Sequence, residues 1–75
     1  MRGELIVLNH TGDMKLIWDG EKRAEVSAAK DMFDSMKTKG YLAYTVDKKG
    51  NKGEVLREFD AELEKIIMTP PMQGG

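Results

Sequence analysis

Cysteine is absent from this 75-residue sequence, and the chain has only two prolines, one tryptophan and no long apolar run. Without cysteine, disulfide scaffolds, Cys-ligated zinc and thiol catalysis are excluded. No apolar segment approaches the roughly 18 residues of a membrane-spanning helix. The opening segment Met1-Arg2-Gly3-Glu4 leads too quickly into strand-like sequence to hold a signal peptide. We therefore expect a cytoplasmic protein without a membrane partner.

The charge of the chain is nearly balanced, with 12 Lys+Arg, 13 Asp+Glu and a formal net charge of −1. A nucleic-acid-binding protein needs an excess of basic charge to displace counterions, so this balance argues against that class. Hydrophobic residues make up 40% and charged residues 33% of the chain. This composition suits one small globular domain whose few apolar residues form the core.

Two short apolar segments near the N-terminus predict a β-hairpin. The segment 4–10 contains an apolar run of strand length, and 14–19 alternates, with Met14, Leu16 and Trp18 on one face. Thr11-Gly12-Asp13 lies between them and is a turn signal.

A helix is predicted over residues 21–39. Asp19 is the expected N-cap, and Gly40 is the expected left-handed residue that ends the helix. Apolar residues at helical spacing predict one buried stripe with Met32 at its edge. This stripe consists of Val26, Ala29, Phe33 and Met36.

Three further strands are expected after the helix, at residues 41–47, 54–59 and 65–69, with a helical turn at 60–64. In the first of them Leu42, Tyr44 and Val46 alternate and are expected to face the core. The resulting order β-β-α-β-β-β, with one main helix packed on a mixed sheet, predicts a two-layer α+β fold of the β-grasp type. A right-handed crossover would place the strand after the helix parallel to the first strand. We expect one domain over 1–69, followed by a flexible tail over 70–75.

Catalytic candidates are few, so we do not expect an enzyme. His10 is the only histidine, and no serine or cysteine lies near it in sequence to form a nucleophile–base pair. The carboxylate pairs Asp31/Asp34 and Glu62/Glu64 lie in highly charged segments, where solvated surface charge is the better interpretation. No metal site is expected; the segment 47–54 has the outline of a calcium loop, but three of its positions are lysines, which repel a cation.

The lysines of this loop form a local positive patch made of Lys48, Lys49 and Lys52. A nucleic-acid contact there is one interpretation, but no arginine or aromatic residue is interleaved to stack on bases. Lysines that protect a sheet edge explain the pattern equally well. No nucleic-acid partner is expected.

The last six residues, Pro70-Pro71-Met72-Gln73-Gly74-Gly75, form a different kind of segment. Fully extended, six residues reach about 20 Å. Two prolines stiffen the first half, and two glycines make the tip narrow. This shape suits a tail whose end enters a tight channel of another protein, although the default for a chain end is fraying without a role.

A small predicted β-grasp domain followed by Gly74-Gly75 resembles the ubiquitin-like proteins. The segment from Ile66 through Pro70-Pro71 to Gly75 is most similar to the prokaryotic sulfur carriers, which are the small subunit of molybdopterin synthase and its thiamine-pathway relative. The resemblance implies that an ATP-dependent activating enzyme adenylates the terminal glycine carboxylate. The product is then a thiocarboxylate, or in the modifier branch a thioester and an isopeptide. Of the family's features, only Pro70, Pro71, Gly74 and Gly75 carry over to this chain.

Two hypotheses follow from the sequence. The first is a non-enzymatic carrier or modifier that is activated at its C-terminal diglycine, without a cofactor of its own because ATP is used by the activating enzyme. Its other partner would be a target protein or the large subunit of a synthase. The alternative is a small protein-binding module, such as a bacterial or phage accessory protein, that docks through its uncovered sheet face or an edge strand and has no tail chemistry.

Overall fold

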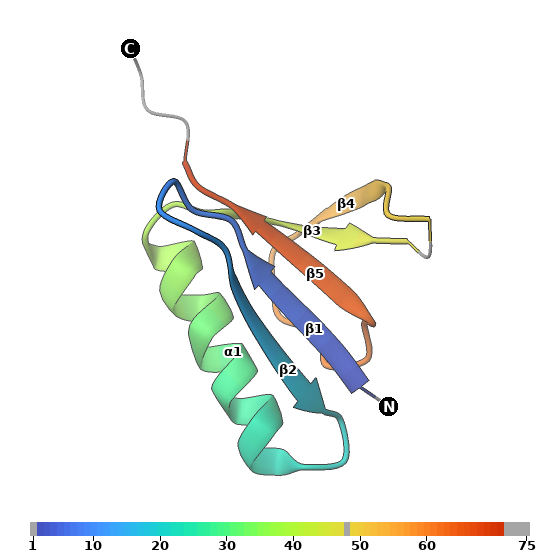
Figure 1. The fold of residues 1–75 in the computed structure, drawn as a ribbon. Coiled ribbons are helices and arrows are strands. Elements are labelled where there is room, and N and C mark those ends of the chain that lie inside the picture. Colours follow the sequence, from blue (N-terminus) through green and yellow to red (C-terminus); the bar gives the residue numbers. More distant parts are fainter. Residues whose placement is uncertain (1, 48, 72–75) are drawn as a thin grey trace.

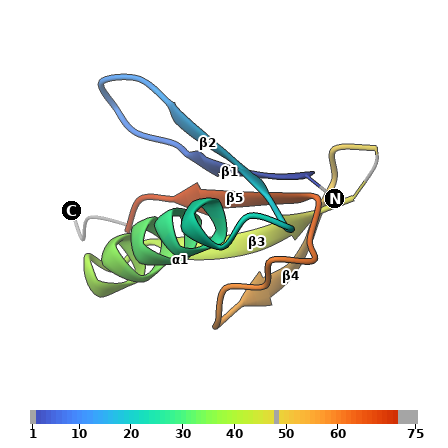
Figure 2. The same cartoon turned by 90° about the horizontal axis from the view of Figure 1, so that it is seen from below.

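A five-stranded mixed sheet with one helix across one of its faces makes up the fold (Figures 1 and 2). The computed structural model describes residues 2–47 and 49–71. The predicted α+β class is confirmed at this level. The elements are β1 (Arg2–Val7), β2 (Met14–Asp19), α1 (Arg23–Thr38), β3 (Leu42–Val46), β4 (Lys52–Leu56) and β5 (Lys65–Thr69).

The strand order across the sheet is β2-β1-β5-β3-β4. The last strand, β5, is therefore the central one, and it pairs parallel to β1 and antiparallel to β3. The expected hairpin is present, because β1 and β2 pair antiparallel. The expectation that the strand after the helix runs parallel to the first strand is wrong: β3 runs antiparallel to β5, and β5 occupies the place beside β1. Local sequence patterns do not specify which later strand enters the centre of a sheet.

The core lies between the sheet and α1. Alternate residues of neighbouring strands face the helix, as in the register Leu5↔Ile66. The indole of Trp18 lies edge-on to Phe59, with ring centroids 5.0 Å apart, and its Nε1 donates to the Ala61 carbonyl at 3.1 Å. This bond ties the segment between β4 and β5 to the core. The residues that are at most 3% exposed are Leu5, Val7, Trp18, Ala29, Phe33, Ala43, Ile66 and Met68.

The predicted helix stripe is confirmed, but the predicted start of the helix is not. Ala29 and Phe33 are buried, and the other stripe residues pack half-buried against the core. Residue Lys22 occupies the N-cap position and makes no side-chain capping bond. Asp19 belongs to β2 instead, because the pairing of β2 with β1 extends to this residue. Its Oδ1 accepts a bond from the Glu21 amide at 2.9 Å.

The end of the helix follows the prediction. Lys39 is the C-cap residue, and the next residue, Gly40, has a φ of +95°. A left-handed backbone at this position costs glycine little and other residues more.

The predicted face of β3 is wrong. Ala43 is the buried residue, opposite Met68 of β5, whereas Leu42 is 45% exposed. Leu42, Tyr44 and Val46 lie on the sheet face away from α1, because alternate residues of a strand point to opposite faces. The larger apolar side chains of this strand lie on the face away from α1 and the smaller Ala43 and Thr45 on the helix side, so the size pattern indicates the wrong face.

The segment around β4 also differs from the prediction. β4 begins at Lys52, inside the predicted loop, and ends at Leu56 rather than at 59. The expected helical turn at 60–64 is a turn in which Asp60 Oδ1 accepts a bond from the Glu62 amide at 2.9 Å. Of the predicted tail, Pro70 and Pro71 are described, whereas residues 72–75 and the prediction that they are flexible lie outside the described residues.

Candidate functional site

The chain leaves the sheet from its central strand. The pairing of β5 with β3 continues to Thr69, opposite Leu42, and on the other side Met68 O accepts a bond from the Leu8 amide at 2.9 Å. Pro70 and Pro71 come next, and neither has an N–H that could continue a ladder. The pairing with β1 ends at Met68 and the pairing with β3 ends at Thr69, so the chain leaves the sheet directly before Pro70 (Figure 1).

The first part of the predicted tail lies beside the end of α1. Pro70 is half-buried and Pro71 is exposed. A Cβ atom placed on Gly40 would lie 3.4 Å from the Cβ of Pro71, so the two residues are close neighbours. The structure thus places two of the four predicted tail residues at the exit of β5. The other two, Gly74 and Gly75, lie outside the described residues.

The sheet face opposite α1, here called the open face, has an apolar centre. Its members follow from the strand registers, which pair Ile6 with Ile67 and Tyr44 with both Ile67 and Val55. Three apolar residues on this face have large exposed fractions. They are Ile17 (46%), Leu42 (45%) and Val55 (54%).

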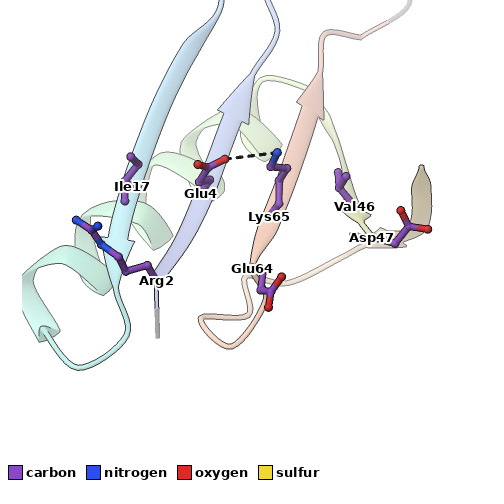
Figure 3. A pocket seen from close by; sticks show the side chains of 7 residues that line it. All are labelled: Arg2, Glu4, Ile17, Val46, Asp47, Glu64 and Lys65. Atoms are coloured by element: carbon purple, nitrogen blue, oxygen red, sulfur yellow. Dashed lines mark ion pairs between the residues drawn. The ribbon is translucent and has the colours of Figure 1, made fainter. Parts of the chain in front are cut away.

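Charged side chains occupy the end of the open face where β1 and β5 begin. Glu4 lies between two lysines, with its carboxylate oxygens 3.4 Å from Lys15 Nζ and 3.6 Å from Lys65 Nζ. A shallow depression of about 540 Å³ lies beside these residues, and Figure 3 shows Glu4 and Lys65 pointing toward each other across it. The lining residues are Arg2, Glu4, Ile17, Val46, Asp47, Glu64 and Lys65.

The charged side chains that line this depression are carboxylates and cations. Asp47 Oδ1 accepts bonds from the amides of Asn51 and Lys49, both at 2.9 Å. These bonds hold the pKa of Asp47 below its usual value, and the bond from the Asn51 amide has the largest effect. The ionised carboxylate therefore stabilises its own loop. Sequence reasoning missed the depression because its residues come from four different strands and their ends.

The catalytic candidates considered from the sequence are not brought together. His10 is exposed in the connection between β1 and β2. Asp34 accepts a bond from Lys30 Nζ at 2.7 Å, and this contact raises the pKa of Lys30. Glu62 and Glu64 are exposed beside the start of β5. Over residues 2–47 and 49–71, no three histidine, aspartate or glutamate side chains gather in a way that could hold a metal ion.

The lysine patch is partly described. Lys49 and Lys52 are exposed, and Lys52 Nζ lies 5.0 Å from the centroid of the Tyr44 ring, at the rim of the open face. Lys48 lies outside the described residues. The lysine on β4 thus contacts an aromatic ring of this protein, as expected for a side chain that lies along a sheet edge.

No helix in the described part of the chain is long and apolar enough to cross a membrane. Comparison of the chain with protein-family models, with curated proteins and with solved structures finds no match.

Proposed function

We propose that this protein is a non-enzymatic carrier or modifier of ubiquitin-like β-grasp fold, which works through the carboxylate of Gly75. The observation that supports the proposal most strongly is the continuation of the central strand β5 into Pro70-Pro71, followed in sequence by Met72-Gln73-Gly74-Gly75. A segment that leaves from the centre of the sheet starts at a fixed point on a rigid layer. The segment that carries the diglycine therefore starts at a fixed position relative to any partner bound to the domain.

The sheet order is compatible with the β-grasp arrangement. Two hairpins, β1–β2 and β3–β4, lie on either side of β5, and α1 crosses one face. This likeness concerns the fold, and the function itself is inferred from the diglycine segment by analogy.

The chemistry that we propose begins with an unreactive group, because a free carboxylate is a poor electrophile. An oxygen of the Gly75 carboxylate attacks the α-phosphorus of ATP, and pyrophosphate leaves. The resulting acyl adenylate is attacked at its carbonyl carbon by sulfide (HS⁻), AMP leaves, and a thiocarboxylate forms. In the modifier branch, an enzyme thiol displaces AMP to give a thioester, and a lysine amine of a target then displaces the thiol. All catalytic groups belong to the partner enzymes.

The test is incubation of the purified protein with ATP, a sulfur donor and the activating enzyme encoded nearest to its gene. Intact mass spectrometry distinguishes the exchange of one oxygen for sulfur from a covalent adduct on a target. Deletion of Gly75, or Gly74→Val, should abolish either product. Gln73→Ala keeps both glycines and serves as the matched control. Full biological activity of the truncated chain would contradict the proposal.

The second candidate is a protein-binding module without tail chemistry, and the exposed apolar residues of the open face favour it. Ile17, Leu42 and Val55 are each more than 40% exposed on one sheet face. A tag fused after Gly75 separates the two candidates. A binding module tolerates the tag, whereas a carrier loses its reacting carboxylate.

A further inference from the structure

The two edges of the sheet are β2 and β4 (Figure 2), and they differ in how open they are to a further strand. The amides of Glu4 and Leu8 donate to β5, to Glu64 O and Met68 O, both at 2.9 Å. The even-numbered residues of β1 therefore face β5, and its odd-numbered residues face β2. From the register, for example Leu5↔Leu16, the even-numbered residues of β2 bond to β1. The backbone groups of Lys15, Ile17 and Asp19 consequently point away from the sheet.

The carboxyl end of this edge is already occupied. The Asp19 amide donates to Glu25 Oε1 at 2.9 Å, and Asp19 O accepts a bond from the Lys22 amide at 2.9 Å. Both bonds confirm that the backbone of Asp19 faces outward. In β2 the outward N–H and C=O groups of Lys15 and Ile17 then remain, and they can form hydrogen bonds with the backbone of an added strand.

The edge at β4 has a feature that opposes strand addition. Its register with β3 shifts between Tyr44 and Val46, which marks a bulge. Bulges are among the devices by which proteins protect sheet edges. Edge β4 is therefore protected.

Edge β2 has no such bulge. Six consecutive residues pair with β1 without a register shift. Its single lysine, Lys15, is turned across the sheet toward Glu4 on β1, at 3.4 Å, and so leaves the edge uncovered. Apolar side chains flank the edge on both faces: Ile17 (46% exposed) on the open face, and Met14 (42% exposed) with half-buried Leu16 on the helix face.

A second copy of this chain does not fit the edge well. An antiparallel, two-fold pairing that uses all the outward groups sets Lys15 opposite Ile17 of the copy. The same register then sets Asp13 opposite Asp19, so two like charges face each other. The register that would pair Lys15 with Asp19 needs the backbone of Asp19, which Glu25 and Lys22 already occupy.

We propose that β2 is a docking edge for an extended segment of a different protein, which adds as a sixth strand and carries apolar side chains on both of its faces. Its backbone pairs with Lys15 and Ile17, and its apolar side chains cover Ile17 on one face and Met14 and Leu16 on the other. This surface lies on an edge strand, whereas the proposed reacting segment follows the central strand. The proposal is independent of chemistry at Gly75.

The test uses a synthetic seven-residue peptide with valine at the five central positions, threonine at each end and both ends blocked, titrated into ¹⁵N-labelled protein. We expect slower hydrogen exchange at the Lys15 and Ile17 amides and NOE contacts from the peptide backbone to both residues. A peptide with the same side chains, N-methylated on its bonding edge, should not bind. Ile17→Pro removes an outward amide without removing a bond to β1, and should weaken binding about five- to tenfold. Ile17→Val keeps the amide and is the matched control.

Three results would overturn the proposal. The first is no binding of the peptide to wild-type protein at millimolar concentration, and the second is protection of β4 amides in place of those of Lys15 and Ile17. The third is a dimer of the protein alone in sedimentation analysis with both amides protected, which would make a second copy the occupant. Circular dichroism of Ile17→Pro checks that its fold is intact. If that variant does not fold, the two peptides on wild-type protein decide the question.

Discussion

The fold depends most directly on Phe33, the residue at the centre of the helix stripe. Its side chain is fully buried, and its ring lies edge-on to Phe59 with centroids 5.8 Å apart. Truncation of a buried phenylalanine to alanine costs about 3–5 kcal/mol, because apolar contacts are lost and a cavity remains. Alanine is the better helix former by roughly 0.5 kcal/mol, which offsets a small part. We expect Phe33→Ala to lower the free energy of unfolding by about 3–4 kcal/mol.

This loss is a large part of the protein's total free energy of unfolding. At about 0.05–0.15 kcal/mol per residue, a chain of this length has a total stability of roughly 4–11 kcal/mol. With a urea dependence of about 1–3 kcal/mol per molar, the unfolding midpoint should fall by about 1 M or more. Trp18 is the only tryptophan and is fully buried, so its fluorescence reports unfolding directly.

The matched control is Leu42→Ala on the open face, where the side chain is 45% exposed. We expect this substitution to cost about 1 kcal/mol or less. If Phe33→Ala costs no more than Leu42→Ala, the helix does not pack on the sheet as described, and the reasoning about the core is refuted.

Two further predictions concern Gly3 and Asp47. A Cβ on Gly3 would overlap the indole of Trp18, so Gly3→Ala should destabilise the protein by about 1–3 kcal/mol in a thermal melt, and an unchanged Tm would contradict the packing. The pKa of Asp47 is lowered by hydrogen bonds from the Asn51 and Lys49 amides, so its stabilisation of the loop is present above the unfolded-state pKa and lost as pH falls through the folded-state pKa. An NMR titration should therefore give a lower midpoint for Asp47 in the folded protein than in urea, and equal midpoints would disprove the contribution.

The helix was predictable because its apolar residues repeat at a spacing that only a helix places on one face. Ala29 and Phe33 are buried as that spacing requires. The face of β3 was not predictable from its own residues. Large apolar side chains such as Leu42 lie on the open face, and the small Ala43 lies under the helix, so residue size gave the opposite answer. The position of β5 depends on long-range pairing, which no local pattern encodes.

The same distinction applies to the candidate sites. Pro70-Pro71 and Gly74-Gly75 are contiguous, so their motif is visible in the sequence. The docking edge is not, because it depends on which backbone groups of β2 point outward, and that follows only from the registers of β1 with two neighbours. The candidate reacting segment could thus be identified from sequence, whereas the candidate docking edge required the structure.

ATP–pyrophosphate exchange tests most directly the proposal that Gly75 is the reacting residue. The activating enzyme encoded nearest to this gene is mixed with ATP, labelled pyrophosphate and either the full chain or the chain without Gly75. The two proteins should melt at nearly the same temperature, since a change at a chain end alters stability by only about 0.5 kcal/mol. We expect exchange of label into ATP with the full chain and none with the shortened one. Equal exchange with both, or none with the full chain, would contradict it.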